Sequence, residues 1–193
     1  KECAEFYEDY LFLGDDGKLI IAPSQSPENR IKDGGEPVSI LYNCSADIEL
    51  CQMALGFAIR AARLLNVDSN KAEIWEGILS KLPIIKIGPQ GELMEFPENF
   101  ETPEPGHRHV SHLIGVFPGR VITDDKTPEL FKAAKRSLEL RLAHGGGHTG
   151  WSRAWVSCLY TVFGEAQKAF EHLKALISDF ATVTLLDLHP PRI

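Results

Sequence analysis

The 193-residue sequence contains few cysteines, and their spacing excludes the usual metal-binding and disulfide frameworks. There are four of them, and no two show the C-x-x-C spacing of zinc ribbons and redox motifs. We therefore expect isolated buried thiols at Cys3, Cys44, Cys51 and Cys158.

Runs of basic residues and long apolar runs are also absent. The 20 Lys and Arg residues against 27 Asp and Glu residues give a formal net charge of -7, which argues against nucleic acid or an anionic membrane as partner. No apolar stretch approaches the ~20 residues of a membrane-spanning helix. Lys1-Glu2-Cys3 does not begin a signal peptide. Because the chain starts inside a helical pattern, we expect it to be part of something longer.

The sequence does contain a series of helical patterns. Apolar residues recur at three- and four-residue spacing between Ser45, the expected N-cap, and Asn66, which predicts a long helix. Further helices are expected at 1–13, 69–82, 127–142, 150–162 and 166–177, and one more begins near His109. A short extended segment at 18–22 and a small hairpin at 84–96 are the strand signals. Seven helical segments predict an all-α class of helical hairpins.

Polar residues cluster in Pro105-Gly106-His107-Arg108-His109-Val110-Ser111-His112-Leu113, directly after a loop with three prolines. Three interpretations are open for this cluster. His107, His109 and His112 could bind zinc, although the carboxylate that a hydrolytic zinc site usually adds is missing between them. Imidazole and guanidinium groups could instead bind the hydroxyls of a sugar. The third interpretation is structural, because most histidines are not ligands and can satisfy loop carbonyls.

Two other segments attract attention but carry weaker signals. Glu28 lies in a loop with Pro23 and Pro27, and a glutamate in such a loop is normally just solvated. The glycine run 145–147 lacks the lysine and the spacing of a phosphate loop, so a flexible turn is expected there.

Four segments taken together resemble motifs of glycoside hydrolase family 95, in the family's order and at similar spacing. They are Ala22-Pro23-Ser24-Gln25-Ser26-Pro27-Glu28-Asn29, the histidine cluster, Thr149-Gly150-Trp151-Ser152-Arg153-Ala154-Trp155 and Leu188-His189-Pro190-Pro191. The resemblance implies part of an (α/α)6 barrel, with about seven of its twelve helices. It also implies an inverting α-L-fucosidase that acts on terminal α-1,2-linked fucose, with some relatives that prefer α-L-galactosides.

The resemblance also implies roles for single residues. Glu28 matches the general acid, and Arg108 and His109 match residues that contact the fucose. Trp151 is expected to line or buttress the pocket, and His107 and His112 to hold the turn. A glycosidic oxygen leaves only if it is protonated as its bond breaks, so the family chemistry needs such an acid. No cofactor and no metal are implied, and the partner is a fucosylated oligosaccharide or glycan.

The chain departs from the family pattern in two places. In the family, a pair of asparagines upstream of this segment activates the water, and a supporting aspartate follows the His-Pro-Pro motif. The 193 residues contain neither of these groups. Arg192 also stands where an aromatic residue is common. We therefore expect residues 1–193 to be a single partial domain from the middle of the barrel, inactive alone and prone to self-association. The alternatives are a non-catalytic glycan-binding helical module and the zinc hydrolase described above.

Overall fold

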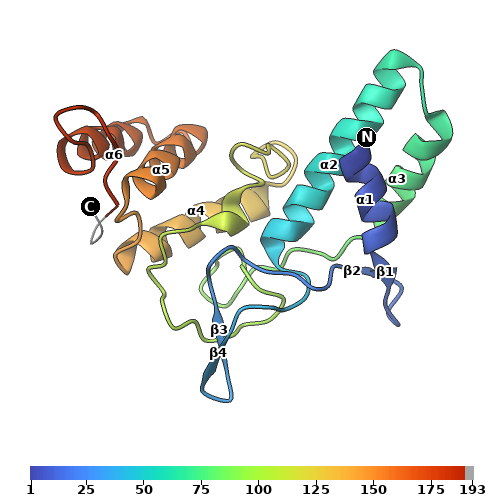
Figure 1. Ribbon diagram of the computed structural model, residues 1–193, viewed down its shortest axis with the longest axis horizontal. Helices are drawn as coiled ribbons and strands as arrows, with labels where there is room; N and C mark the ends of the chain where they lie inside the picture. Colours follow the sequence, from blue (N-terminus) through green and yellow to red (C-terminus); the bar gives the residue numbers. More distant parts are fainter. Residues whose placement is uncertain (190–193) are drawn as a thin grey trace.

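The computed structural model describes residues 1–189, and its architecture is mainly α-helical, as the apolar spacing predicts (Figure 1). The helices α1, α2 and α3 form one group, and α5 and α6 form an antiparallel hairpin at the other end, with α4 between the two groups (Figure 1). The helix bounds are α1 Glu2–Tyr10, α2 Ser45–Leu65, α3 Ser69–Lys81, α4 Pro128–Ala143, α5 Gly150–Val162 and α6 Ala166–Asp179.

The long helix α2 confirms the clearest periodic pattern in the sequence. Its buried face includes Ile48, Cys51 and Leu55, which are at most 2% exposed, and it ends where Asn66 adopts a left-handed conformation with a φ of 56°. Its N-cap is Cys44 rather than the expected Ser45, because the Ser45 hydroxyl donates a hydrogen bond to the Met94 carbonyl instead.

The prediction of an α-helix that begins near His109 is wrong. The structure has only a short 3₁₀ helix there, η1, at Ser111–Leu113. The backbone there makes i→i+3 bonds, from Leu113 N–H to the Val110 carbonyl and from Ile114 N–H to the Ser111 carbonyl. An α-helix would next need the Gly115 N–H, but that group donates to the Glu49 carboxylate at 2.7 Å. The described residues therefore contain six α-helices instead of seven helical segments.

The structure confirms that the chain contains little β-strand, but most of the strands lie at other positions in the sequence than predicted. β1 Phe12–Leu13 pairs with β2 Leu19–Ile20, so α1 ends earlier than the predicted residue 13. β3 Ile31–Asp33 pairs with β4 Glu36–Val38 in a stretch that the sequence indicates as loop. The hairpin predicted at 84–96 is reduced to a single bridge between Ile87 and Leu93.

One hydrophobic core connects all six helices and reaches η1. Its fully buried side chains include Leu55, Trp75, Leu113, Leu138 and Leu159. The long segments that connect α1 to α2 and α3 to α4 also contribute to this core, through Ile21 and Val116 for example, and they carry Glu28, Arg108 and His109. No helix within residues 1–189 has both the length and the apolar character needed to cross a membrane.

Large apolar side chains remain exposed on the outer faces of several helices. On α2, Leu64 is 83% exposed, and on α6, Ile177 is 61% exposed. Others are Phe57 and Leu65 on α2, Ile74 on α3, and Phe170 and Leu173 on α6. Several of these side chains share one helix, unlike the single apolar residues scattered over an ordinary protein surface. Such faces are typical of surfaces that another element or chain covers.

Candidate active site

Glu28 sits at the corner of a tight turn that places its side chain at the surface. The turn runs from Ser26 to Asn29, whose N–H donates to the Ser26 carbonyl at 3.0 Å, with Pro27 and Glu28 as its central residues. Glu28 has a φ of 57°, in the left-handed region that a non-glycine residue enters at a cost of about 1–2 kcal/mol. Strain of this kind persists where the surrounding structure holds the backbone in place.

The structure brings Glu28 together with Arg108 and His109, which lie 80 and 81 positions further along the chain. The Arg108 guanidinium donates to Glu28 Oε2 in an ion pair, and His109 Nε2 lies 3.5 Å from the same oxygen. The Glu28 side chain is 58% exposed, whereas those of Arg108 and His109 are 26% and 18% exposed. One accessible carboxylate therefore faces two better-buried nitrogen groups.

An open hollow of about 720 Å³ adjoins this carboxylate. Its lining is mainly polar and comes from the Glu28 loop, the β4 end and the segment before η1, namely Gln25, Glu28, Asn29, Arg30, Ser39, Pro103, Glu104, His107 and Arg108. The volume is within the usual range for small-molecule sites. The hollow contains two glutamates, Glu28 and Glu104, and only Glu28 forms an ion pair with Arg108.

Helix α5 supplies the aromatic side of the site. The Trp151 ring is 4.8 Å from the His109 ring and 5.3 Å from the Trp155 ring, and Trp151 remains 49% exposed. The Ser152 hydroxyl donates to the Arg108 carbonyl at 2.6 Å, so the first turn of α5 is attached to the backbone of the Arg108 segment. Trp151 is thus placed beside His109 rather than in the hollow next to Glu28.

His109 is held as a neutral imidazole. Burial lowers its pKa, the positive charge of Arg108 lowers it further, and the pKa falls from 6.5 to about 4. A neutral imidazole has one donor and one acceptor nitrogen, which suits the hydroxyl groups of a sugar.

The other two histidines of the cluster point to different neighbours. His107 is buried, and its Nδ1 accepts a hydrogen bond from the His109 N–H at 3.1 Å, which holds the turn as expected. His112 is buried in η1, with Nδ1 3.8 Å from Glu95 Oε1. Within residues 1–189 there is no group of three or more His, Cys, Asp or Glu side chains placed to hold a metal ion. The rings of His107 and His109 lie 5.2 Å apart, whereas His112 faces Glu95.

Comparison with known proteins gives the relationship of the whole chain. Residues 1–192 match the glycosyl hydrolase family 95 catalytic domain. The chain belongs to this family. It is 37% identical over 171 residues to "Alpha-L-fucosidase 2" of Arabidopsis thaliana, an alignment that covers 87% of this chain and 20% of that protein. It is 24% identical over 191 residues to "Probable alpha-fucosidase A" of Aspergillus niger, covering 93% of this chain and 23% of that protein.

The chain spans about a fifth to a quarter of the length of these family 95 relatives. The mainly helical architecture with two short strand pairs agrees with part of an (α/α)6 barrel. Of the fourth predicted motif, Leu188 and His189 are described, with the Leu188 carbonyl accepting from the Gly150 N–H at the start of α5. Pro190, Pro191 and Arg192 lie outside the described residues.

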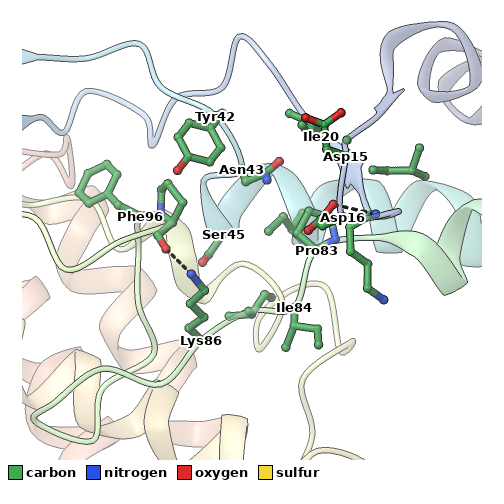
Figure 2. A pocket seen from close by; sticks show the side chains of 16 residues that line it. Asp15, Asp16, Ile20, Tyr42, Asn43, Ser45, Pro83, Ile84, Lys86 and Phe96 are labelled. Atoms are coloured by element: carbon green, nitrogen blue, oxygen red, sulfur yellow. Dashed lines mark hydrogen bonds between the residues drawn. The ribbon is translucent and has the colours of Figure 1, made fainter.

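Another hollow, of about 610 Å³, contains none of the residues predicted for the family 95 site (Figure 2). Three of its polar side chains bond to neighbouring protein groups. Asn43 accepts from the Ile21 N–H, Lys86 donates to the Pro97 carbonyl, and Asp16 accepts from the Lys18 N–H. The remaining lining shown in Figure 2 is largely apolar, with Ile20, Pro83, Ile84 and Phe96. The hollow beside Glu28 has more polar side chains in its lining than this one and is therefore better suited to a ligand rich in hydroxyl groups.

Two residues beneath the site were missed from the sequence, Glu95 and Arg141. Arg141 lies on α4 in the same stripe as the buried residues Ala134, Ser137 and Leu138. An arginine at a buried position of a helical stripe indicates a buried acidic partner, since a lone buried charge is unfavourable. That signal was present in the sequence. Nothing in the sequence around Glu95 indicates that it is this partner.

Proposed function

We propose that this chain is part of an inverting glycosidase that removes terminal α-1,2-linked L-fucose from fucosylated oligosaccharides or glycans. The observation that supports it most directly is the meeting of the Glu28 carboxylate with Arg108 and His109, where Glu28 and Arg108 line an open hollow. The resemblance to family 95 assigns the acid to the Glu28 position and the sugar contacts to the Arg108 and His109 positions. Their convergence is not a consequence of sequence proximity, because 80 residues separate the two segments.

In this proposal Glu28 gives a proton to the glycosidic oxygen as the bond to the anomeric carbon breaks. The carboxyl group must carry that proton when the sugar is bound, whereas Arg108 holds the carboxylate in the substrate-free arrangement. We therefore propose that sugar hydroxyls take over the Arg108 and His109 contacts and release Glu28 toward the leaving oxygen. Trp151 offers an apolar surface beside His109 for a carbon face of the sugar.

Inversion needs a second group on the opposite face of the sugar that activates a water molecule, about 6.5–9.5 Å from the acid. We propose that this role belongs to other segments of the family 95 catalytic domain, as the resemblance implies. We therefore expect the 193-residue chain alone not to release fucose from 2′-fucosyllactose, while a complete catalytic domain containing it does so. Free fucose is the readout, and the folded state of the chain is checked by circular dichroism.

The two arms of this assay separate the alternatives. A complete domain that binds 2′-fucosyllactose and releases no fucose would favour a non-catalytic glycan-binding module. Turnover by the 193-residue chain that is lost on Glu28→Gln would place the water-activating group within this chain, with Glu104 as the first candidate to replace.

The exposed apolar faces of α2 and α6 lead to a proposal about association. We expect the isolated 193-residue chain to self-associate through them, because burying such faces removes apolar surface from water, worth about 25 cal/mol per Å². Light scattering after size-exclusion chromatography should give a mass above 21.4 kDa that depends on concentration. Replacing Leu64 and Ile177 with lysine should shift it toward the monomer. Unchanged association in that double variant would contradict the assignment of these faces.

A further inference from the structure

Beneath the proposed active site lies a buried carboxylate that contacts both of its loops. Glu95 Oε1 accepts a hydrogen bond from the Ser26 hydroxyl at 2.5 Å, and Oε2 accepts one from Asn29 Nδ2 at 2.9 Å. The same Oε2 receives the Arg141 guanidinium at 2.6 Å. All four residues are at most 9% exposed. Ser26 and Asn29 are the first and last residues of the turn that carries Glu28.

The second loop approaches Glu95 through His112. Its Nδ1 lies 3.8 Å from Glu95 Oε1, a neighbouring position without a hydrogen bond, and His112 follows Arg108 and His109 by only a few residues. Glu95 therefore lies between the segment of the proposed acid and the segment of the proposed sugar contacts. Arg141 fixes this carboxylate from below, from the rigid helix α4.

We infer that Glu95 is a positioning residue for Glu28: it holds the two ends of the strained turn and sets the place of the Glu28 carboxyl relative to Arg108 and His109. The expected effect of Glu95 on catalysis rests on the proposed function. The expected effect of Glu95 on the conformation of the Glu28 turn does not. Glu95 itself faces away from solvent, with about 8% of its side chain exposed, so it does not contact the sugar.

The left-handed φ of Glu28 supports the inference. A turn with this conformation at a non-glycine residue needs contacts that hold it, and the side chains of the residues at both ends are bonded to the same carboxylate. Small displacements of a catalytic group, on the order of 1 Å, can lower a rate by about 10²-fold. Loosening the turn should therefore affect catalysis more than it affects binding.

The test is Glu95→Gln in a complete catalytic domain that contains this segment. The amide removes the negative charge and, depending on its orientation, places an N–H₂ group either where Ser26 donates or where Asn29 and Arg141 donate. Hydrogen exchange of the Asn29 backbone amide should become about tenfold faster or more. Losing a hydrogen bond to a charged group lowers the free energy of local opening enough for an increase of that size. The kcat on 2′-fucosyllactose should fall about tenfold or more with a smaller change in KM, and less on an aryl fucoside with an activated leaving group.

The matched control is Glu49→Gln, another fully buried glutamate, which accepts from the Gly115 N–H and does not contact the Glu28 turn. It should leave the exchange of residues 24–31 and the leaving-group pattern unchanged. Glu95→Gln with unchanged exchange at residues 24–31 would overturn the inference. Faster exchange in Glu95→Gln without the kinetic pattern would keep the positioning of the turn but contradict its link to acid catalysis, and with it the role of Glu28.

A milder variant keeps the test decisive if Glu95→Gln does not fold. Ser26→Ala removes one hydrogen bond to Glu95 and leaves the Glu95–Arg141 pair and Asn29 in place. It should show the same faster exchange at Asn29 and the same preference for activated substrates, to a smaller degree. Normal exchange and normal kcat in Ser26→Ala would overturn the inference.

Discussion

Replacing Glu28 with glutamine in a complete catalytic domain is expected to lower kcat on 2′-fucosyllactose by about 10²–10⁴-fold. Glutamine keeps the size of the side chain and can still contact Arg108, so the turn and most of the sugar binding should remain. What is lost is the proton for the leaving oxygen. An aryl fucoside whose leaving group departs without a proton should therefore be much less affected. Initial rates on the two substrates, with KM determined for each, measure the difference.

The control for this prediction lies in the same hollow. Glu104→Gln removes the second lining glutamate, which is not paired with Arg108, and should leave most of the activity on both substrates. Equal losses on natural and activated substrates in Glu28→Gln would assign Glu28 to sugar positioning. A loss in Glu104→Gln that matches the pattern predicted for Glu28 would transfer the acid to that residue.

The helices of this chain could be predicted from sequence because their signals are local. The apolar stripes of α2, α5 and α6, and the Thr127-Pro128-Glu129 start of α4, decide backbone conformation within a few residues. The β3–β4 hairpin was missed because its residues alternate poorly and because Ile31 and Val38 pack in a separate small cluster with Phe96 and Phe100, which are distant in sequence. The α-helix predicted at His109 is wrong because the competing Glu49 contact to Gly115 comes from α2.

The site was predictable only where the family resemblance supplied it. Local patterns favoured a solvated role for Glu28, and its exposure agrees with that, but its contact with Arg108 depends on the tertiary fold. The resemblance identified Glu28 and Arg108, which line the hollow, and their neighbours His109 and Trp151, but not the residues that hold the Glu28 turn. Glu95 sits in coil between Met94 and Phe96, so no periodic pattern marks it as buried. Positioning residues of this kind are recognised by their bonds, which a single sequence does not contain.

Arg141→Met is expected to destabilise the folded chain by about 3–5 kcal/mol at pH 7, because it leaves the buried Glu95 carboxylate without its guanidinium partner. Methionine retains most of the apolar stem of the arginine, so lost packing contributes little. Urea unfolding followed by circular dichroism measures the change in the free energy of unfolding. The control is Arg136→Met on the same helix: Arg136 is about 45% exposed, and its contact with Glu139 at 4.0 Å should contribute less than about 1 kcal/mol.

The pH dependence distinguishes a buried charge from a general packing defect. Burial alone raises the pKa of the Glu95 carboxyl, but Arg141, His112, Ser26 and Asn29 together lower it from 4.5 to about 2. In the unaltered chain this group contributes stability that is complete above pH 4.5 and is lost as the pH falls toward 2. Arg141 is the largest of the causes that lower this pKa, so without it the pKa of Glu95 in the folded chain rises and the carboxyl takes up a proton at a higher pH than in the unaltered chain. The difference in stability between Arg141→Met and the unaltered chain should therefore shrink as the pH is lowered from about 7 toward the acid range in which the unaltered chain loses the contribution of Glu95.

Adding Glu95→Gln to Arg141→Met completes the test, because it removes the unpaired charge. If the charge causes the loss, the double variant should be more stable at pH 7 than Arg141→Met alone, and its stability should depend less on pH. If the loss comes from packing, the second substitution should add to the first. The double variant still lacks the carboxylate that bonds to Ser26 and Asn29, so the exchange of the Glu28 turn should stay fast even where global stability recovers. Recovery of both properties together would contradict the separate roles of Arg141, which compensates the buried charge, and of Glu95, which holds the turn.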